Sequence, residues 1–309
     1  MLTRREFTMS LIATGASAGV ASLTACTGIL PAVKATTTAS LMAVDCHAHV
    51  FLRSLSMPDR RRAPSGYDAS PDDYWKTLHA NGMTHGVLVQ PSFLGTDNSY
   101  MVEALRQYPD RLRGIAVVDP SISVAQLDLL QAAGVVGIRL NQVGLPTPDF
   151  ASPAWRGLLK QLRLRNWQVE VHQLAHGLQP IIDPLVDAGI DVVVDHFGRP
   201  DPQLGVDDPG FNYLLKQGAS GKVWIKLSGA YRNGANGRGQ QVALQAMPLL
   251  RETYGLKQLV WGSDWPHTLF ERTAFYADQR QLLNQWLPEA RDRQQVLGDV
   301  PARLFGFPV

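Results

Sequence analysis

Two histidines lie one residue apart after a short apolar run in the stretch VDCHAHVF, residues 44–51. Imidazole nitrogens bind divalent cations, exchange protons near neutral pH and polarise carbonyl groups. Residues i and i+2 of a strand point to the same face, so His47 and His49 share one face, while Cys46 and Ala48 point to the helical layer. The pair indicates a functional centre only when other reactive side chains come close to it.

Further reactive side chains follow apolar runs elsewhere in the chain. His172 ends the stretch VEVH, His196 and Arg199 lie in VVVDHFGRP, and Asp264 lies in VWGSDWPH. A carboxylate can accept a proton from water, and neutral imidazoles can polarise a carbonyl group or hold a cation. Together with the first pair, these residues predict a catalytic centre if the fold brings them to one place.

The elements that would position these residues alternate between short β-branched runs and amphipathic stretches. One such stretch, SPDDYWKTLHANG, carries a helix cap at Ser70 and a proline in its first turn at Pro71. The predicted strands are Met42–Cys46, Gly86–Val89, Gly114–Val118, Val136–Leu140, Gln168–Val171, Asp191–Val194, Val223–Leu227 and Gln258–Trp261.

Alternating strands and helices predict parallel pairing, because a parallel neighbour requires a crossover connection. Eight units within residues 42–309 match an α/β fold of the (β/α)8 TIM-barrel type, whose usual length is about 250 residues. An open doubly wound sheet is the alternative, but no Gly-x-Gly-x-x-Gly stretch follows the first strand. Closure of the barrel would place Asp264 beside His47 and His49, with His172 and His196 across the mouth.

The composition sets limits on the class of protein. Of 309 residues, 45% are hydrophobic and 18% are charged, with a formal net charge of +2. This balance predicts a globular protein and no nucleic-acid partner, since the longest basic run is Arg60–Arg62. Whether it forms a monomer or a dimer is left open.

The first residues have the pattern of an export signal. A twin-arginine stretch, TRREF, precedes an apolar segment from Leu11 to Leu23 that is too short and rich in small residues to span a bilayer. LTAC, ending at Cys26, resembles a lipobox, with plain cleavage near Ala25 as the alternative. We expect residues 1–26 to be a twin-arginine lipoprotein signal and 27–41 a tether. The protein would then be periplasmic, touching the membrane only through lipid on Cys26.

Several stretches together resemble the amidohydrolase superfamily, metallo-dependent-hydrolase-like TIM barrels. DCHAHVF, GTDN, RGIAVVDP, GIRLN, DHFGRP and VWGSDWPH occur in the family's order between about residues 43 and 308. The similarity is greatest to the lactonase branch that contains 2-pyrone-4,6-dicarboxylate hydrolases and sulfomuconolactone hydrolases. It implies an enzyme that hydrolyses lactones, with Asp264 as the general base and His47, His49 and His196 polarising the carbonyl group.

The resemblance leaves the metal open. His47, His49, His172 and Asp264 match the ligands of one divalent ion, Zn or Mn, in other amidohydrolases. The pyrone-dicarboxylate enzymes have Tyr where this chain has His172 and are thought to work without metal. A two-metal site is not expected, because no Lys for the bridging position occurs from residue 77 to 159 and that strand carries Arg139. We favour one ion, with metal-free catalysis as the alternative.

Three arginines are expected at the barrel mouth, where guanidinium groups would bind a carboxylate through paired donors. By resemblance, the substrate-binding residues are Arg139, Arg199, Arg232, Ser92 and Tyr67, and we add His267 from its place after the last strand. NQVGLP lacks a second arginine of the family, and the family's Asn is replaced near Thr268 or Leu269. These departures indicate a related anionic lactone or carboxylic acid rather than the pyrone dicarboxylate.

Two other functions are compatible with the same residues. A metal-dependent decarboxylase would use the same histidines and aspartate, although DHFGRP and GTDN favour the lactonase branch. A non-catalytic lipoprotein could use the same rim to bind an anionic ligand, but Asp264 beside an intact histidine pair argues for catalysis.

Overall fold

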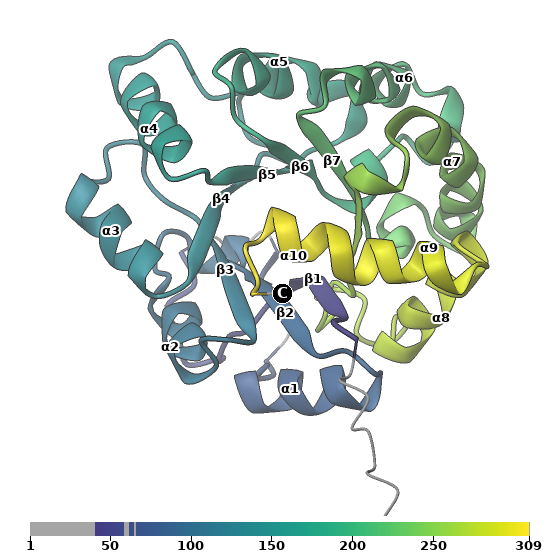
Figure 1. Cartoon of the computed structure of the whole chain (residues 1–309), viewed down its shortest axis with the longest axis horizontal. Coiled ribbons are helices and arrows are strands. Elements are labelled where there is room, and N and C mark those ends of the chain that lie inside the picture. The colour runs from purple at the N-terminus through teal and green to yellow at the C-terminus, as the bar shows by residue number, and fades with distance from the viewer. Residues whose placement is uncertain (1–40, 59–61, 65, 309) are drawn as a thin grey trace, which may run out of the picture. The chain divides into compact units, whose positions relative to one another are not determined.

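The computed structural model describes residues 41–58, 62–64 and 66–308 of the chain. Eight parallel strands pair in sequence order and form a nearly closed barrel, with helices on its outside (Figure 1). The predicted (β/α)8 fold is confirmed. The strands are β1 (Val44–Ala48), β2 (His85–Val89), β3 (Leu112–Ala116), β4 (Val135–Asn141), β5 (Gln168–His172), β6 (Val192–Val194), β7 (Val223–Leu227) and β8 (Leu259–Trp261).

The helices begin where the capping residues predict. Ser70 accepts a hydrogen bond from the Asp73 amide at the start of α1, and Ser123 forms a reciprocal capping box with Gln126 at the start of α3. The helices are α1 (Pro71–Ala80), α2 (Ser99–Gln107), α3 (Val124–Ala132), α4 (Pro153–Leu164), α5 (Gln179–Asp187), α6 (Pro209–Lys216), α7 (Arg238–Tyr254), α8 (Tyr276–Trp286), α9 (Ala290–Gln294) and α10 (Val300–Leu304). Short helical turns are η2 (Ser92–Leu94), η3 (Ala175–Gly177), η4 (His196–Gly198), η5 (Gly205–Asp207), η6 (Gln217–Ser220), η7 (Ala230–Asn233), η8 (Leu256–Gln258) and η9 (Gln295–Asp299).

The first and last strands meet just beyond the end of β8. The Asp264 amide donates to the His47 carbonyl at 2.8 Å, and the His49 amide donates to the Trp265 carbonyl at 2.8 Å. Ala48 pairs with Trp265 in parallel orientation. These bonds bring residues more than two hundred positions apart to one place, as barrel closure requires.

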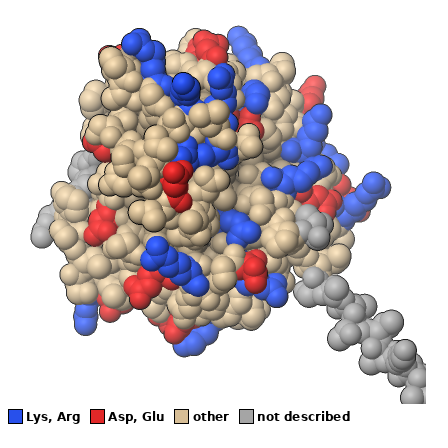
Figure 2. Space-filling view, turned by 60° about the vertical axis from the view of Figure 1, so that its left-hand side comes forward, with Lys and Arg blue, Asp and Glu red and all other residues tan. Residues whose placement is uncertain are grey.

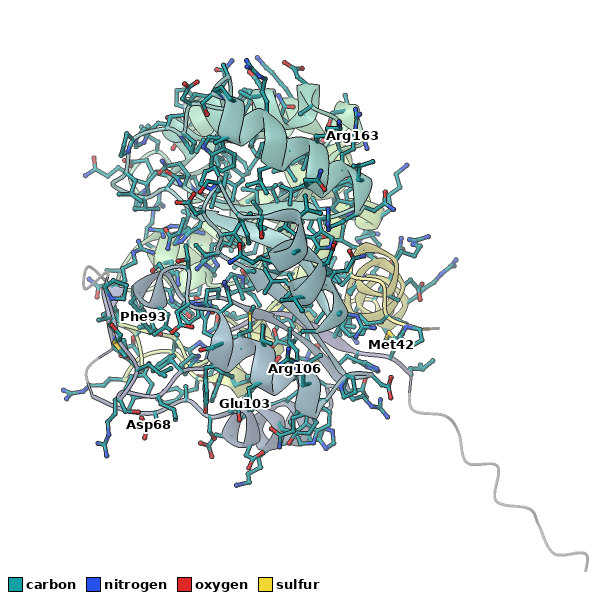
Figure 3. The ribbon with its side chains drawn as sticks, turned by 90° about the vertical axis from the view of Figure 1, so that its left-hand side faces the viewer. Met42, Asp68, Phe93, Glu103, Arg106 and Arg163 are labelled. Atoms are coloured by element: carbon teal, nitrogen blue, oxygen red, sulfur yellow. The ribbon has the colours of Figure 1, made fainter. Side chains whose placement is uncertain are left out.

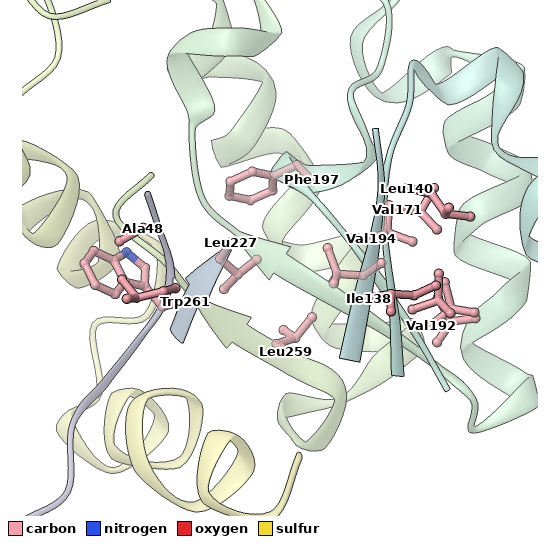
Figure 4. Close-up of a cluster of buried hydrophobic side chains, with 14 of the residues drawn as sticks. Ala48, Ile138, Leu140, Val171, Val192, Val194, Phe197, Leu227, Leu259 and Trp261 are labelled. Carbon is pink, nitrogen blue, oxygen red and sulfur yellow. The ribbon is translucent and has the colours of Figure 1, made fainter. Parts of the chain in front are cut away.

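The hydrophobic core has two parts, because strand residues alternate between the two faces of the sheet. The larger part lies between strands and helices and includes Ala48, Ile138, Val194 and Trp261 (Figure 4). A smaller cluster joins strand residues such as Val87 to residues of α10 and the C-terminal segment, which cover one end of the barrel (Figure 1).

The two ends of the barrel differ. Met42, before β1, and Phe93, in η2 after β2, lie at opposite ends of the molecule in Figure 3. The C-terminal segment covers the end where strands begin, since Arg303 and Leu304 border the same groove as Trp224 and Gln168. The other end, where the strands finish, is therefore available for chemistry.

Several strand bounds differ from those predicted. β1 begins two residues later than expected, and β3 ends at Ala116 rather than Val118. At Val117 the side chain of Asn98 takes over the pairing: its Oδ1 accepts from the amide and its Nδ2 donates to the carbonyl, at 3.0 and 2.8 Å. The apolar run continues to Val118, beyond the last residue that pairs with a neighbouring strand, so hydropathy predicts a strand that is too long.

The prediction that Cys46 faces the helices is wrong. Cys46 is buried in the smaller, inner cluster with Val44 and Val87, whereas Ala48 packs in the outer one as expected. The pairing of β1 with β2 shifts register between Asp45 and Ala48, which breaks the alternation of faces. As a result, Cys46 and His47 both point inward.

The predicted signal, the Cys26 lipid site and residues 27–40 of the tether lie outside the described residues. Within the described part of the chain, no helix combines the length and hydropathy needed to cross a membrane. On the face seen in Figure 2, basic and acidic side chains are interspersed, in keeping with the small net charge.

Candidate active site

A small cavity opens at the end of the barrel where the strands finish. Residues from the ends of several strands and the connections after them form its wall, as in other barrels of this type. The lining residues are His49, Arg62, Pro91, Ser92, Phe93, Arg139, Asn141, His172, His196, Arg232, Asp264, Thr268 and Leu269.

Three of the predicted reactive groups meet at this cavity: His49 and Asp264 line it, and His47 lies buried beside them. Asp264 Oδ1 lies 3.8 Å from His47 Nε2 and 3.6 Å from His49 Nε2. All three side chains are buried, and the rings of His47 and His49 stand edge to face with centroids 4.8 Å apart. The predicted contact between the last strand's carboxylate and the first strand's imidazoles is thus present.

The two oxygens of Asp264 have different surroundings. Oδ2 accepts from Arg232 Nε and, at 2.7 Å, from the Tyr231 hydroxyl, both in η7. Oδ1 has no hydrogen-bond partner among the described residues. Burial alone would raise the pKa of this carboxyl, but the Arg232 guanidinium outweighs it and holds the pKa well below its usual range. Asp264 is therefore ionised, with one oxygen fixed and the other available.

His49 presents a lone pair to this free oxygen. Its Nδ1 lies 2.7 Å from the Val89 carbonyl, which can only accept, so Nδ1 carries the proton and Nε2 does not. Burial is the main cause of a lowered pKa for His49, which keeps the ring neutral. A water molecule between His49 Nε2 and Asp264 Oδ1 would find two acceptors.

His47 lies deeper, at 0% exposure, and its Nδ1 has charged neighbours. The Lys226 ammonium is 2.9 Å from Nδ1, and Asp195 Oδ1 is 3.3 Å from it. Burial and the Lys226 charge lower the pKa of His47 to about 3, so the ring is neutral. Nε2 has no hydrogen-bond partner within the described residues.

A buried network of charges beneath the histidines was not predicted. Lys226 in β7 pairs with Glu170 of β5 at 2.7 Å and with Asp195, next to β6, at 3.2 Å. Arg139 of β4 binds the other Asp195 oxygen at 3.2 Å. Burial would raise the pKa of Asp195, but the charges of Lys226 and Arg139 outweigh this and hold the pKa well below its usual value. The sequence feature that could have predicted this network is a charged residue inside each of two apolar runs, Glu170 in QVEVH and Lys226 in VWIKL.

His196 lies between the first histidine pair and the arginines. Its ring centroid is 4.9 Å from that of His47 and 5.0 Å from that of His172, and its Nδ1 is 2.8 Å from Ser228 Oγ. The residue adopts a left-handed backbone with φ of 54°. Burial is the largest cause of a pKa held well below the usual value for this ring, which is therefore neutral.

His172 does not join the predicted metal ligands. Arg199 Nη1 lies 3.0 Å from its Nε2, while Arg139 Nη2 and Arg62 Nη1 each lie 3.4 Å from its Nδ1. Guanidinium groups face both ring nitrogens, so a divalent cation would be repelled there. Three of the four predicted ligands come together, and the fourth belongs to an arginine cluster.

The predicted substrate-binding residues divide into two sets. Ser92, Arg139 and Arg232 line the cavity. Arg139 and Arg232 each also hold a carboxylate of the protein, so only part of each guanidinium faces a ligand. Arg199 is not among the lining residues, but it contacts His172, which is.

Tyr67 and His267 are not among the lining residues. Tyr67 packs against Phe51, with ring centroids 5.3 Å apart, in a small cluster beside the site. His267 is 4% exposed, and its Nδ1 lies 3.1 Å from the Tyr231 hydroxyl. The structure places both of them next to the residues of the cavity wall rather than in it.

Two groups of described side chains come close enough together to hold a metal ion: His47 with Asp195 and His196, and His47 with His49 and Asp264. In the first group the Lys226 ammonium already lies against His47 Nδ1 and Asp195 Oδ1. In the second group the same ammonium lies behind the shared ligand His47. A second cation is disfavoured at both, so the residues do not fit a resident metal in this arrangement.

Comparison with known proteins gives consistent results. A family model described as amidohydrolase matches residues 44–307. The 4-sulfomuconolactone hydrolase of Hydrogenophaga intermedia is 30% identical over 275 residues, covering 85% of this chain and 88% of that protein. The 2-pyrone-4,6-dicarboxylate hydrolase of Comamonas testosteroni is 31% identical over 278 residues, covering 85% and 90%.

A solved structure is similar over nearly its whole length. It is a probable 2-pyrone-4,6-dicarboxylic acid hydrolase from Acinetobacter baumannii with citric acid bound. It is 40% identical to this chain, with a TM-score of 0.82, and the match covers 86% of this chain and 99% of that one.

Proposed function

This chain belongs to the amidohydrolase family and is an enzyme of its lactone-hydrolase branch; from this premise we propose that it opens the ring of a small carboxylate-bearing lactone. One observation carries the proposal: the ionised Asp264, in the cavity wall, keeps a buried oxygen beside His47 and His49 that has no hydrogen-bond partner among the described residues. This is the place at which a water molecule can be held and deprotonated.

The attacking water would lie between His49 Nε2 and Asp264 Oδ1, donating one proton to each. Its oxygen attacks the lactone carbonyl, and Asp264 takes the proton as the new carbon–oxygen bond forms. Because Arg232 and Tyr231 fix Oδ2, Oδ1 is already oriented for this transfer.

The tetrahedral oxyanion that results needs positive charge. Arg139 and Arg232 both line the cavity, and His196 lies in the same wall. Collapse of the intermediate breaks the bond to the ring oxygen, which takes back the proton from Asp264. One water is consumed, and the product carries one new carboxyl and one new hydroxyl group.

The substrate class follows from the charge of the cavity. Four arginines lie in its wall or contact His172, so the site favours a ligand that carries negative charge. The named relatives act on lactones with sulfonate or carboxylate groups, and the Acinetobacter baumannii structure holds citric acid. We infer an anionic lactone related to these but not identical, because the residues after β4 and β8 depart from the family's pattern.

A panel of lactones tests the proposal. Purified protein would be assayed with muconolactone, pyrone and sugar-acid lactones, each with and without a strong chelator. We expect at least one carboxylated lactone to be opened, with one acid equivalent released per turnover and no effect of the chelator. The matching lactone without the carboxylate should react at least about 100-fold more slowly, since it lacks charge-assisted pairing.

Two outcomes would contradict the proposal. Release of carbon dioxide from a carboxylated substrate would assign the alternative decarboxylase reaction. Binding of anionic ligands without turnover of any lactone would assign the non-catalytic function.

We also propose that residues 1–26 direct export by the twin-arginine route and that Cys26 carries a lipid anchor, which makes the enzyme periplasmic. The support is the pattern TRREF followed by LTAC. Cys26→Ala should move the protein from the membrane fraction to the soluble periplasmic fraction. Retention of this variant in the membrane fraction would contradict the anchor.

A further inference from the structure

Lys226 is a fully buried lysine that the proposed reaction does not use. A buried ammonium group is costly unless its N–H donors are paired. Lys226 Nζ has three such neighbours: Glu170 Oε2 at 2.7 Å, His47 Nδ1 at 2.9 Å and Asp195 Oδ1 at 3.2 Å. The ammonium group therefore forms ion pairs with two buried carboxylates and a hydrogen bond with a histidine of the reactive centre.

This contact determines where the proton of His47 lies. An ammonium group can only donate, so His47 Nδ1 must accept, and the single proton of the neutral ring is then on Nε2. We propose that Lys226 is a positioning residue that holds His47 in this tautomer and thereby makes the centre a site for water rather than for a divalent cation.

The opposite tautomer is disfavoured by the same neighbours. A proton on Nδ1 could be donated to Asp195 Oδ1, 3.3 Å away, but it would then face a Lys226 donor at 2.9 Å. Asp195 has two other cationic partners: the Lys226 ammonium forms an ion pair with the same oxygen at 3.2 Å, and Arg139 donates to the second oxygen at 3.2 Å. The carboxylate gains little from a histidine proton, whereas the ammonium would lose its acceptor.

The tautomer of His47 determines what can bind in the space between His47, His49 and Asp264. The His47 Nε2 hydrogen has no partner among the described residues and lies near two acceptors, Asp264 Oδ1 and His49 Nε2. One water satisfies all three, because it accepts from His47 and donates to the other two. A metal ion instead needs the lone pair of His47 Nε2, which the proton occupies.

The inference deepens the proposed function, but its test does not use lactone turnover. The test compares the wild type with Lys226→Met/Glu170→Gln, in which a buried positive charge and a buried negative charge are removed together. Glu170→Gln alone is the matched control, because it keeps the Lys226 contact with His47. Folding of each full chain would be checked by its thermal unfolding curve.

Zinc binding by titration calorimetry is the first measurement. We expect the double variant to bind one zinc ion about 10- to 100-fold more tightly than the wild type, which is the range over which groups behind a ligating histidine change metal affinity. Glu170→Gln should behave like the wild type. Equal zinc affinity for the double variant and the wild type would overturn the proposal.

The ring nitrogens of His47 in the wild type give a second measurement, which does not depend on the variants folding. In protein labelled with nitrogen-15 at histidine, with His47→Asn used for assignment, we expect His47 to show a protonated Nε2 and an unprotonated Nδ1. A proton on Nδ1 would contradict the role of Lys226, whatever the outcome of the lactone assays.

Discussion

The two carboxylate oxygens of Asp264 have different roles. Arg232 and Tyr231 hold Oδ2, while Oδ1 faces the two histidines of β1 with no hydrogen-bond partner among the described residues. A carboxylate held in this way keeps its charge and its orientation before any ligand arrives, which is the condition for efficient proton transfer. Arg232, predicted to bind substrate, is mainly a partner of this carboxylate.

Tyr231→Phe tests whether this orientation matters. The substitution removes a donor to Oδ2 at 2.7 Å and keeps the aromatic ring that packs against Phe270. We expect kcat/KM to fall by about 10- to 100-fold, because a hydrogen bond to a charged group contributes about 1.5–3 kcal/mol. The measurement is steady-state kinetics on the most reactive lactone of the panel.

A matched control is Tyr213→Phe, which removes a hydroxyl that donates to Asp183 Oδ1 at 2.5 Å, outside the residues of the cavity. Its kcat/KM should equal that of the wild type. Equal losses in both variants would mean that the Tyr231 effect reflects stability rather than the position of Asp264.

Residues at strand ends were predictable, and residues beneath them were not. His47, His49 and Asp264 follow apolar runs, and barrel closure is enough to bring them together. Lys226 and Asp195 owe their roles to neighbours on other strands, so their partners cannot be read from local sequence. His172 was misplaced among the metal ligands because its surroundings, three guanidinium groups, come from three separate segments.

The connections after β6 and β8 carry the reactive residues in an unusual backbone. His196 and Asp264 both have positive φ, 54° and 62°, although neither is glycine. Such conformations are costly for residues with a Cβ and are found mainly where function requires them. After β7, Gly229 has φ of 51°, and its position leaves no room for a side chain.

Gly229→Ala tests this tight packing. An added Cβ would lie 2.8 Å from His196 Nδ1 and 2.9 Å from Asp264 Oδ2, so both groups must shift. We expect kcat/KM to fall by about 100-fold, the effect of misplacing reactive groups by about 1 Å. The free energy of unfolding should also fall, by about 1–3 kcal/mol for the strained backbone.

Gly221→Ala separates the two effects. Gly221 also has positive φ, 66°, at the end of η6, but an added Cβ there would meet nothing within 4 Å. This variant should lose similar stability, measured by urea unfolding, and keep full activity. If Gly229→Ala were as active as Gly221→Ala, the packing argument would fail.

Strand and helix identity followed from the sequence, while their ends depended on tertiary contacts. Ser70 was predicted to cap a helix, and the structure confirms it. The end of β3 is set by the Asn98 side chain, nineteen positions earlier. The register shift in β1 turned Cys46 inward, which an alternating pattern cannot predict.

Across the whole barrel, buried neutral histidines link stability to pH. Burial is the first cause of the lowered pKa values of His47, about 3, and of His85 and His267, both about 4. Because the unfolded chain takes up these protons below about pH 6.5 and the folded protein does not, the stabilisation is complete above pH 6.5. It declines as the pH falls towards 3–4. Glu170 acts in the opposite direction. Burial raises its pKa to about 7, so as the pH falls below 7 the folded protein takes up a proton there before the unfolded chain does, which stabilises the fold.

We therefore expect the free energy of unfolding to fall between pH 7 and pH 5, by about 1.4 kcal/mol per pH unit for each histidine involved. Urea unfolding curves at closely spaced pH values would measure it. Constant or increasing stability over this interval would contradict the neutral state of the buried rings.

At the scale of the whole molecule, the alternation of strands and helices was sufficient for the fold, and the motif series for the family. Arg139 and Arg232 line the cavity and also pair with internal carboxylates. That double role depends on contacts between separate strands and connections, which the order of residues does not specify.

The most direct test of the account is the activity of Asp264→Asn. The amide keeps the shape of the side chain but cannot take a proton from water, so kcat/KM for the best lactone should fall by about 100- to 10,000-fold. If the folded variant kept the kcat/KM of the wild type, or changed only in KM with kcat unaffected, Asp264 would not be the base and the proposed hydrolytic centre would be wrong.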